Sequence, residues 1–369
     1  MKKICFVTAA RSEYGLIKWI MKEVEKSSMF QLQLIVTGAH LLPEQGHTID
    51  AIIDDGFVID EIIDIHLKLS SKTDIAESMG RIAEGFSRAF EKLSPDCVVV
   101  LGDRYELLPI VNTAFVMTIP IVHISGGDVT EGAIDDGIRN AVTMLADYHF
   151  PGTPESANNI IRMRGSRDKV WAVGEPGLDV LYKESLISRD ELAENLGLDS
   201  EKKWVLLTYH PETRKKLNEN LSVVKTCVEL LLDIDGIQVV ATYSNVDYGG
   251  DKINLLLEEV SRKEKSILKV VPSLGNKRYL SFMRQVAFVI GNSSSGIIET
   301  PMLGIPSINI GERQKGRHIC KNVIQTSDSR ADIEDAIKTA LSLDKFEEDY
   351  YWGDGHASER IIKALSEAL

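Results

Sequence analysis

Short runs of apolar and β-branched residues alternate with amphipathic helical patterns along the whole chain, and this alternation limits the folds that the sequence can adopt. In the first half, such runs occur at residues 3–8, 32–37, 97–101, 119–124 and 148–151. In the second half, they recur at residues 204–208, 237–242, 268–271, 288–291 and 306–310. Strands that alternate with helices form parallel sheets with helices on both faces. We therefore predict an α/β protein made of two Rossmann-like halves.

The length of the chain and its charge distribution indicate two domains. The chain has 369 residues, which is more than one hydrophobic core of ordinary size requires. A charged stretch precedes the strand predicted at residue 204, and we place the domain boundary before it. We predict a first domain at residues 1–175 and a second at residues 176–350. Residues 351–369 are expected to form a helix that packs back on the first domain.

Composition excludes several classes of protein. The longest apolar stretch, residues 107–124, is interrupted by Pro109, Asn112 and Pro120, which predicts a helix followed by a strand rather than a membrane span. The apolar N-terminal run ends at Arg11, so we recognise no signal peptide and expect a cytoplasmic protein. The 42 Lys and Arg against 55 Asp and Glu give a net charge of −13, which argues against a nucleic-acid or membrane-surface binder. The 4 scattered cysteines indicate neither a disulfide framework nor a metal site.

Residues 288–300 have the pattern of a buried strand that turns into a helix through three serines. The N–H groups at the start of such a helix, together with the hydroxyls of Ser293, Ser294 and Ser295, can bind a phosphate. Glu299 lies one turn into the helix, where it is placed to accept hydrogen bonds from sugar hydroxyls. The alternative is that the serines only cap the helix. The segment matches neither the Walker pattern nor Gly-x-Gly-x-x-Gly.

Acidic side chains follow two other predicted strands. Asp103 and Arg104 come directly after the strand at residues 97–101. The glycine-containing loop after the next strand carries Asp128, Glu131 and Asp135. Ligands bind at the carboxyl ends of parallel strands, and crowded carboxylates raise one another's pKa toward values useful in proton transfer. We predict catalytic acids here; the alternatives are a helix cap made by Asp103 and Arg104, and a solvated acidic turn.

Further candidates lie at other strand ends. His210 is suited to proton transfer or to donating a hydrogen bond to phosphate. Arg11 and Arg313, one in each domain, match phosphate or carboxylate recognition, with surface salt bridges as the alternative. Asn245 is either a nucleotide or sugar contact or an ordinary turn residue, and His40 is either functional or a satisfied loop histidine. The sequence has no Gly-x-Ser-x-Gly pattern, so we do not expect covalent catalysis.

Six of these motifs occur in a fixed order. They lie at residues 11–15, 102–106, 123–128, 209–213, 291–296 and 311–317. Together they resemble the hydrolysing UDP-N-acetylglucosamine 2-epimerases of sialic-acid biosynthesis. The resemblance implies the two-domain glycosyltransferase-B fold, with a nucleotide-sugar substrate in a central cleft between the two Rossmann-like domains. It also implies a homodimer and a reaction that needs no cofactor or metal.

The resemblance further implies a mechanism. A base removes the C2 proton, UDP leaves by anti elimination to give a glycal, and water then adds to give free N-acetylmannosamine. Asp103 and Asp135 correspond to acids that handle protons. Relatives place a carboxylate either at the position of Ser125 or, as Glu, at that of Asp128. We therefore rank Asp128 first as the C2 base, with Glu131 and Asp103 as alternatives.

Nucleotide contacts are also assigned by the resemblance. His210 and Arg11 correspond to contacts of the diphosphate, and Glu299 corresponds to the residue that binds the ribose. The other residues expected to contact UDP or the sugar are Arg104, Asn245, Ser293, Ser294, Ser295 and Arg313.

Other functions are compatible with much of this pattern. One alternative is a UDP-2,4-diacetamido-2,4,6-trideoxyglucose 2-epimerase of legionaminic-acid synthesis, whose motifs are nearly the same. Others are a non-hydrolysing epimerase, a glycosyltransferase on the same scaffold, and a nucleotide-sugar binding module without turnover. The loop that contains Gly126 and Gly127 favours the hydrolysing branch. No basic or amphipathic membrane-facing segment of the kind often found in glycosyltransferases is visible, and the many carboxylates disfavour a module without turnover.

Overall fold

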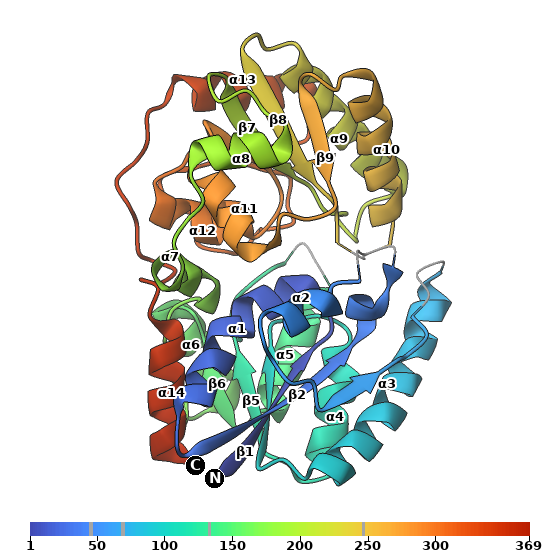
Figure 1. Ribbon diagram of the computed structural model, residues 1–369, viewed down its shortest axis with the longest axis vertical. Coiled ribbons are helices and arrows are strands. Elements are labelled where there is room, and N and C mark those ends of the chain that lie inside the picture. The colour runs from blue at the N-terminus through green and yellow to red at the C-terminus, as the bar shows by residue number, and fades with distance from the viewer. Residues whose placement is uncertain (44–46, 68–70, 132–133, 246–247) are drawn as a thin grey trace. The chain divides into compact units, whose positions relative to one another are not determined.

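The chain folds into two units, each of which contains one parallel six-stranded sheet (Figure 1). The computed structural model describes residues 1–369 except 44–46, 68–70, 132–133 and 246–247. The first unit comprises Met1–Val129, Asp135–Lys183 and Gly353–Leu369, and the second comprises Thr130–Ile134 and Glu184–Trp352. The predicted α/β class with two Rossmann-like halves is confirmed.

The sheet of the first unit has the strand order β3-β2-β1-β4-β5-β6. Its strands are β1 (Lys2–Thr8), β2 (Phe30–Thr37), β3 (Glu61–Ile63), β4 (Cys97–Leu101), β5 (Ile121–Ile124) and β6 (Tyr148–Phe150). The α-helices are α1 (Arg11–Lys26), α2 (Ile49–Asp54), α3 (Lys72–Leu93), α4 (Leu107–Val116), α5 (Asp135–Leu145), α6 (Pro154–Arg164), α7 (Val180–Lys183) and α14 (Ala357–Ala368). The short 3-10 helices η1 (Gly38–Leu41) and η3 (Pro176–Asp179) also belong to this unit.

The sheet of the second unit has the strand order β12-β11-β10-β7-β8-β9. Its strands are β7 (Lys203–Thr208), β8 (Ile237–Thr242), β9 (Leu268–Val271), β10 (Phe288–Gly291), β11 (Ser307–Ile310) and β12 (Val323–Thr326). The helices are α8 (Arg189–Leu196), α9 (Leu217–Leu232), α10 (Gly250–Lys263), α11 (Gly275–Met283), α12 (Ser295–Leu303) and α13 (Arg330–Ser342).

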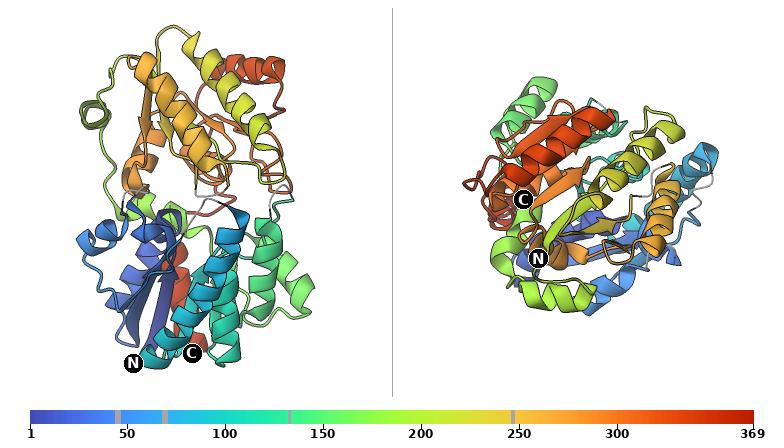
Figure 2. Two further views of the ribbon diagram at one scale, coloured as in Figure 1. Left: turned by 90° about the vertical axis from the view of Figure 1, so that its right-hand side faces the viewer. Right: turned by 90° about the horizontal axis from the view of Figure 1, so that it is seen from above.

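Helices cover both faces of each sheet, as the left view of Figure 2 shows. In the first unit, alternate residues of β4 enter two different cores: Val99 packs with α1, α2 and α14, whereas Val98 packs with α3, α4 and α5. Both residues are almost fully buried, so the strand has no solvent-facing side. This explains its continuous apolar sequence, which is typical of a central parallel strand.

Helix α14 belongs to the first unit although it follows the whole sequence of the second. It lies beside α1, as Figure 1 shows in red and blue. Ile361 and Leu365 are both 0% exposed in the core of that unit. The Asp179 carboxylate accepts hydrogen bonds from the N–H groups of Ala357 and Ser358 at 2.9 and 2.7 Å, which satisfies two donors at the start of the helix.

The predicted elements agree with the structure at most positions. Residues 107–124 form α4 and β5 as predicted, and no helix in the described ranges combines the length and hydrophobicity needed to cross a bilayer. The long helix α3 is capped by Ser71, which accepts a hydrogen bond from the Asp74 N–H. Strands β3 and β12 were not predicted from the sequence. Both are short edge strands with partly exposed residues, so they lack the continuous apolar run of the inner strands.

Candidate functional site

In the first unit, the predicted acids gather around one buried arginine at the carboxyl ends of β4 and β5. The side chain of Arg139, on α5, is 1% exposed and forms an ion pair with Asp103. Its guanidinium also donates to the carbonyl oxygen of Asp128 at 2.9 Å and lies 3.6 Å from the Asp136 carboxylate. Burial opposes the charged form of Arg139, but the surrounding Asp103, Asp128 and Asp136 outweigh it and raise its pKa.

The structure thus brings Asp103 and Asp128 together, although they belong to different loops. Arg139 was not among the residues predicted from the sequence. Its only sequence signal is its place four residues after Asp135 on a helix that follows the acidic loop. Asp135 is the first residue of α5, where its negative charge is stabilised by the helix dipole. The contacts of Glu131 assign it to the second unit, where its N–H donates to the carbonyl oxygen of Lys315 at 2.9 Å.

His123, on β5, forms hydrogen bonds that hold the loops at this edge of the sheet. Its Nε2 lies 2.8 Å from the carbonyl oxygen of Gly102, and its Nδ1 lies 3.1 Å from the Thr143 hydroxyl. Burial lowers the pKa of His123 to about 4, so the ring is neutral and Nε2–H donates to Gly102. The imidazole therefore ties the loop that carries Asp103 to the strand that leads into the Asp128 loop.

The predicted Arg104 is engaged with carboxylates of its own unit. Its guanidinium donates twice to buried Glu106, at 3.0 and 3.2 Å, and lies 4.0 Å from Glu13. The Glu13 carboxylate accepts from the N–H groups of Ala9 and Ala10 at 2.8 and 3.1 Å, at the start of α1. Burial raises the pKa of Glu13 to about 7, although the Arg104 charge and these hydrogen bonds oppose the shift.

Arg11 and His40 lie near the start of α1 and differ in their hydrogen bonding and in their fit to the predicted roles. Arg11 is the first residue of α1, and burial lowers its pKa to about 10. His40 is fully buried, with Nε2 at 2.9 Å from the Thr8 hydroxyl and Nδ1 at 2.8 Å from the Thr48 hydroxyl. Burial lowers the pKa of His40 to about 4. Of the two interpretations left open by the sequence, the structure favours the satisfied loop histidine.

In the second unit, β10 passes through a tight turn into α12. Gly291 has φ +142°, and a Cβ atom there would lie 1.9 Å from the carbonyl oxygen of Thr208, so the turn requires glycine. Ser294 makes no side-chain capping bond, and the Ser293 hydroxyl accepts a long 3.4 Å bond from the Ser295 N–H. Helix capping therefore explains Ser293 and Ser294 poorly, and their hydroxyls suit the predicted binding of an anion at the start of α12. The Ser295 side chain is hydrogen-bonded to Tyr279.

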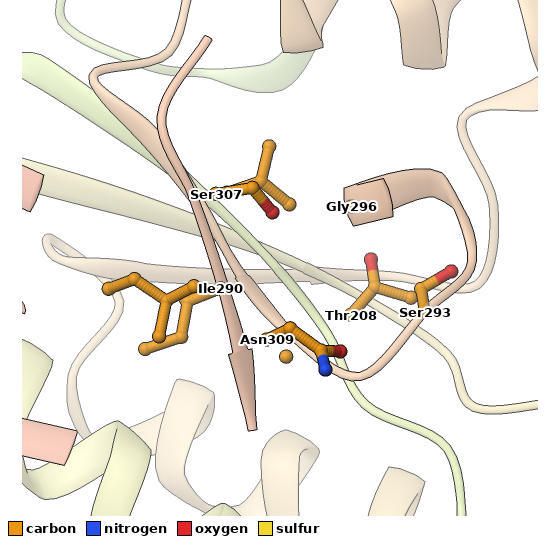
Figure 3. A pocket seen from close by; sticks show the side chains of 9 residues that line it. Thr208, Ile290, Ser293, Gly296, Ser307 and Asn309 are labelled. Atoms are coloured by element: carbon orange, nitrogen blue, oxygen red, sulfur yellow. The ribbon is translucent and has the colours of Figure 1, made fainter. Parts of the chain in front are cut away.

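A closely packed gap beside this turn is too small to hold a water molecule (Figure 3). The side chains of Thr208, Ser293 and Asn309 line it around the chain that leads into α12. Ser307 is buried there, and a Cβ atom at position 296 would lie 2.8 Å from its hydroxyl oxygen. Glycine at position 296 thus allows α12 to approach β11 closely, which fixes the start of the helix on the sheet.

Asn292 joins the predicted residues of the second unit. Its side-chain oxygen accepts from the His210 N–H at 2.7 Å, and its amide group donates to the His210 carbonyl oxygen at 2.9 Å. The Asn292 carbonyl oxygen accepts from Gln314 at 2.8 Å and from Arg313 at 3.3 Å. The fully buried Asn292 was part of a motif, but its role could not be predicted because its partners lie in other loops.

The tautomer of His210 follows from its contact with Asn245. The Nδ1 atom of His210 accepts a hydrogen bond from the Asn245 N–H at 3.1 Å. A neutral imidazole that accepts at Nδ1 carries its proton on Nε2, so Nε2–H is the donor of this ring. Glu299 lies one turn into α12. Burial is the main cause that raises the pKa of Tyr279 to about 12, and the negative charge of Glu299 adds to this shift.

Known proteins resemble the chain over nearly its full length. A family model described as UDP-N-acetylglucosamine 2-epimerase matches residues 22–366. The GDP/UDP-N,N'-diacetylbacillosamine 2-epimerase (hydrolyzing) of Campylobacter jejuni is 36% identical over 88% of this chain and 84% of that protein. The UDP-N,N'-diacetylbacillosamine 2-epimerase (hydrolyzing) of Legionella pneumophila is 31% identical over 99% of this chain and 96% of that protein.

A third relative carries a different substrate name. The UDP-N-acetylglucosamine 2-epimerase of Neisseria meningitidis is 30% identical over 99% of this chain and 95% of that protein. Among solved structures, S. aureus MnaA with UDP has the same fold, with a TM-score of 0.81 at 19% identity over 100% of this chain and 97% of that chain. The family model and the relatives together show that the chain belongs to the UDP-N-acetylglucosamine 2-epimerase family.

Proposed function

We propose that the protein is a hydrolysing 2-epimerase of a UDP-linked 2-acetamido sugar, which releases UDP and the free 2-epimer. The observation that carries this proposal is the cluster of Asp103 and Asp128 around buried Arg139 at the carboxyl edge of a parallel sheet. Ligands bind at this edge, and carboxylates there are placed to move a proton.

The first half of the reaction is an elimination. A carboxylate takes the proton from C2, the electron pair of the broken C–H bond forms a double bond between C1 and C2, and the C1–O bond breaks to release UDP. A carboxylate paired with a guanidinium is in the ionised form that a base needs, which suits Asp103 beside Arg139. Asp128 is the first candidate for the base and Asp103 the second.

The second half is a hydration. Water adds its oxygen to C1 of the glycal, and C2 receives a proton on the face opposite to that from which the first was removed. The two steps consume one water and invert C2. The water supplies the C1 hydroxyl and, through a carboxylic acid, the new C2 hydrogen, while the proton taken from C2 passes from the base to UDP or to solvent, which restores the carboxylates. No hydride acceptor is required, because the substrate is neither oxidised nor reduced overall.

The second unit supplies groups suited to the departing UDP. The Nε2–H donor of His210, the guanidinium of Arg313 and the start of α12 offer positive or hydrogen-bonding charge to a diphosphate. Ser293 and Glu299 are candidates for contacts with phosphate and ribose oxygens, respectively. Such groups accelerate the elimination because negative charge develops on the leaving β-phosphate.

Two UDP-sugars are candidates for the substrate. The relatives from C. jejuni and L. pneumophila, at 36% and 31% identity, carry the diacetylbacillosamine name, whereas that from N. meningitidis, at 30%, carries UDP-N-acetylglucosamine. These identities favour UDP-N,N'-diacetylbacillosamine, which is the 2,4-diacetamido-2,4,6-trideoxy sugar that the sequence analysis keeps as an alternative. The sialic-acid route from UDP-N-acetylglucosamine is the second candidate.

The test is a proton NMR time course in deuterated water with both UDP-sugars in parallel. We expect UDP and a free sugar with deuterium at C2, formed faster from the diacetamido substrate. Faster turnover of UDP-N-acetylglucosamine would reverse the substrate assignment and support the sialic-acid route. Accumulation of a UDP-linked epimer would replace hydrolysis with simple epimerisation, and no reaction of either sugar would refute the proposed function.

A further inference from the structure

The loop after β5 begins with a residue in an unfavourable conformation. Ser125 has φ +56°, in the left-handed region that few residues other than glycine adopt. Its N–H donates to the carbonyl oxygen of Phe150 at 2.9 Å, and its hydroxyl donates to Glu175 Oε2 at 2.7 Å. A short hydrogen bond to a carboxylate is among the strong ones, and it opposes relaxation of the turn.

The carboxylate of Glu175 occupies a close-fitting slot. The residue is 9% exposed and precedes η3. A Cβ atom at Gly152 would lie 2.0 Å from Glu175 Oε1, and one at Gly353 would lie 3.0 Å from the Glu175 N atom. Glycine at position 152 therefore leaves room for the side chain, which crosses directly over the backbone after β6 to reach Ser125.

The next three residues of the loop also lie in close contact with other parts of the first unit, each with a different element. A Cβ atom at Gly126 would lie 2.8 Å from His123 Nδ1, and one at Gly127 would lie 2.2 Å from the carbonyl oxygen of Ser156 on α6. The Asp128 carbonyl oxygen accepts from Arg139 on α5. The loop thus runs in close contact with its neighbours from its first residue to Asp128.

We propose that Glu175 is a positioning residue, which acts through the Ser125 hydroxyl to hold the loop in the conformation that sets Asp128 beside Arg139. The catalytic part of this inference rests on the proposed function, in which Asp128 handles the C2 proton. The ordering of the loop by Glu175 stands on the contacts of the first unit alone. Both Ser125 and Glu175 belong to the first unit.

The experiment compares Ser125→Ala, Glu175→Ala, the double variant and Glu175→Gln. We expect each alanine variant to lower kcat at least about tenfold, with the KM and the Kd for UDP within about twofold of wild type. Because the two side chains act as one unit, the double variant should lose no more than either single variant. Glu175→Gln keeps an oxygen that accepts the Ser125 hydrogen bond and should retain most of kcat. The matched control is Ser327→Ala, which removes a hydroxyl that donates to the Asp332 carboxylate in the second unit and should leave kcat unchanged.

A second measurement does not depend on turnover. Hydrogen exchange of peptides that span residues 121–131 should accelerate in Ser125→Ala and Glu175→Ala and remain at the wild-type rate in Ser327→Ala. Unchanged exchange there, or multiplied losses of kcat in the double variant, would overturn the proposal. If wild type turned over neither UDP-sugar, the proposed function would fail while the exchange rates still decided whether Glu175 orders the loop.

Discussion

His123 and His149 lie opposite each other on β5 and β6, but their surroundings differ. Both side chains are fully buried. Both nitrogens of His123 are hydrogen-bonded, whereas neither nitrogen of His149 has a hydrogen-bond partner in the part of the chain that the structure describes. An unsatisfied buried polar group costs about 1–3 kcal/mol, so the two histidines should respond in opposite ways to removal of the ring.

We predict that His149→Leu is neutral or stabilising at pH 7.5, because leucine fills similar space without unsatisfied nitrogens. His123→Leu should destabilise the protein by about 2 kcal/mol, because it leaves the Gly102 carbonyl and the Thr143 hydroxyl without partners. Urea unfolding of both variants at this pH provides the comparison. A larger loss of stability in His149→Leu than in His123→Leu would contradict this account.

Asp103 provides a residue-scale test of the acid cluster. We predict that Asp103→Asn lowers kcat at least about a hundredfold while the Kd for UDP stays near wild type, since the amide can neither accept a proton nor balance Arg139. Steady-state kinetics and calorimetric titration with UDP measure the two quantities. Asp96→Asn is the control, because Asp96 lies at the other end of β4, where it accepts from the Lys3 N–H. Wild-type kcat in Asp103→Asn would remove this residue from the mechanism.

At the scale of elements, the turn from β10 to α12 determines how the nucleotide-binding groups are presented. Gly291→Ala would place a Cβ atom 1.9 Å from backbone, which cannot move aside without separating β7 from β10. We predict that UDP affinity falls at least about tenfold, with a lower Tm. The control is Gly80→Ala on α3, where a Cβ atom meets nothing within 4 Å and alanine favours the helix. Wild-type UDP affinity in Gly291→Ala would show that the turn does not position the site.

The inner strands were predictable from sequence because they are buried on both faces. The predicted run at residues 97–101 coincides with β4, and that at residues 237–242 coincides with β8. The edge strands β3 and β12 were missed because their partly exposed residues give no such run. The same reasoning located the loops that carry Asp103 and Asp128, because polar residues directly follow apolar strands.

The partners of the site residues could not be predicted in the same way. Arg139 meets Asp103 across 36 residues of sequence, and Glu175 meets Ser125 across 50. Neither Arg139 nor Glu175 directly follows a strand, and an arginine on a helix face normally indicates a surface residue. Only the packing of α5 and of the segment before η3 against the sheet brings these side chains to the loops.

At the scale of the whole molecule, buried histidines should make the protein sensitive to acid. Burial lowers the pKa values of His40 and His123 to about 4 and that of His149 to about 3, from the ordinary 6.5. Below pH 6.5 the unfolded chain binds these protons and the folded chain does not, so stability falls as the pH drops from 6.5 to 4. Each such proton lowers the free energy of unfolding by about 1.4 kcal/mol per pH unit.

Glu13 has the opposite effect on the pH dependence of stability. Because its pKa is raised from 4.5 to about 7 in the folded protein, its contribution to the free energy of unfolding falls as the pH rises through this range. The combined effect of three histidines on the free energy of unfolding is larger than that of one carboxyl. We therefore predict a net loss of stability on acidification. Urea unfolding at several pH values between 4 and 7 measures the slope, and His149→Leu should reduce it. A flat profile would contradict the burial of neutral histidines.

The association state also remains a prediction at this scale. The resemblance noted in the sequence implies a homodimer, so light scattering should give twice the chain mass of 41.0 kDa. A mass equal to that of one chain would refute the expectation.

The place of α14 affects how the protein is completed during synthesis. Ile361 and Leu365 fill part of the first unit's core, yet the ribosome makes them only after all of the second unit. Domains usually mature in the order in which they are translated. Here the order is reversed, because the second unit has its whole sequence by Trp352 while the first still lacks a core helix. The nascent chain must therefore keep the surface that α14 later covers, including part of α1, from aggregating until that helix emerges.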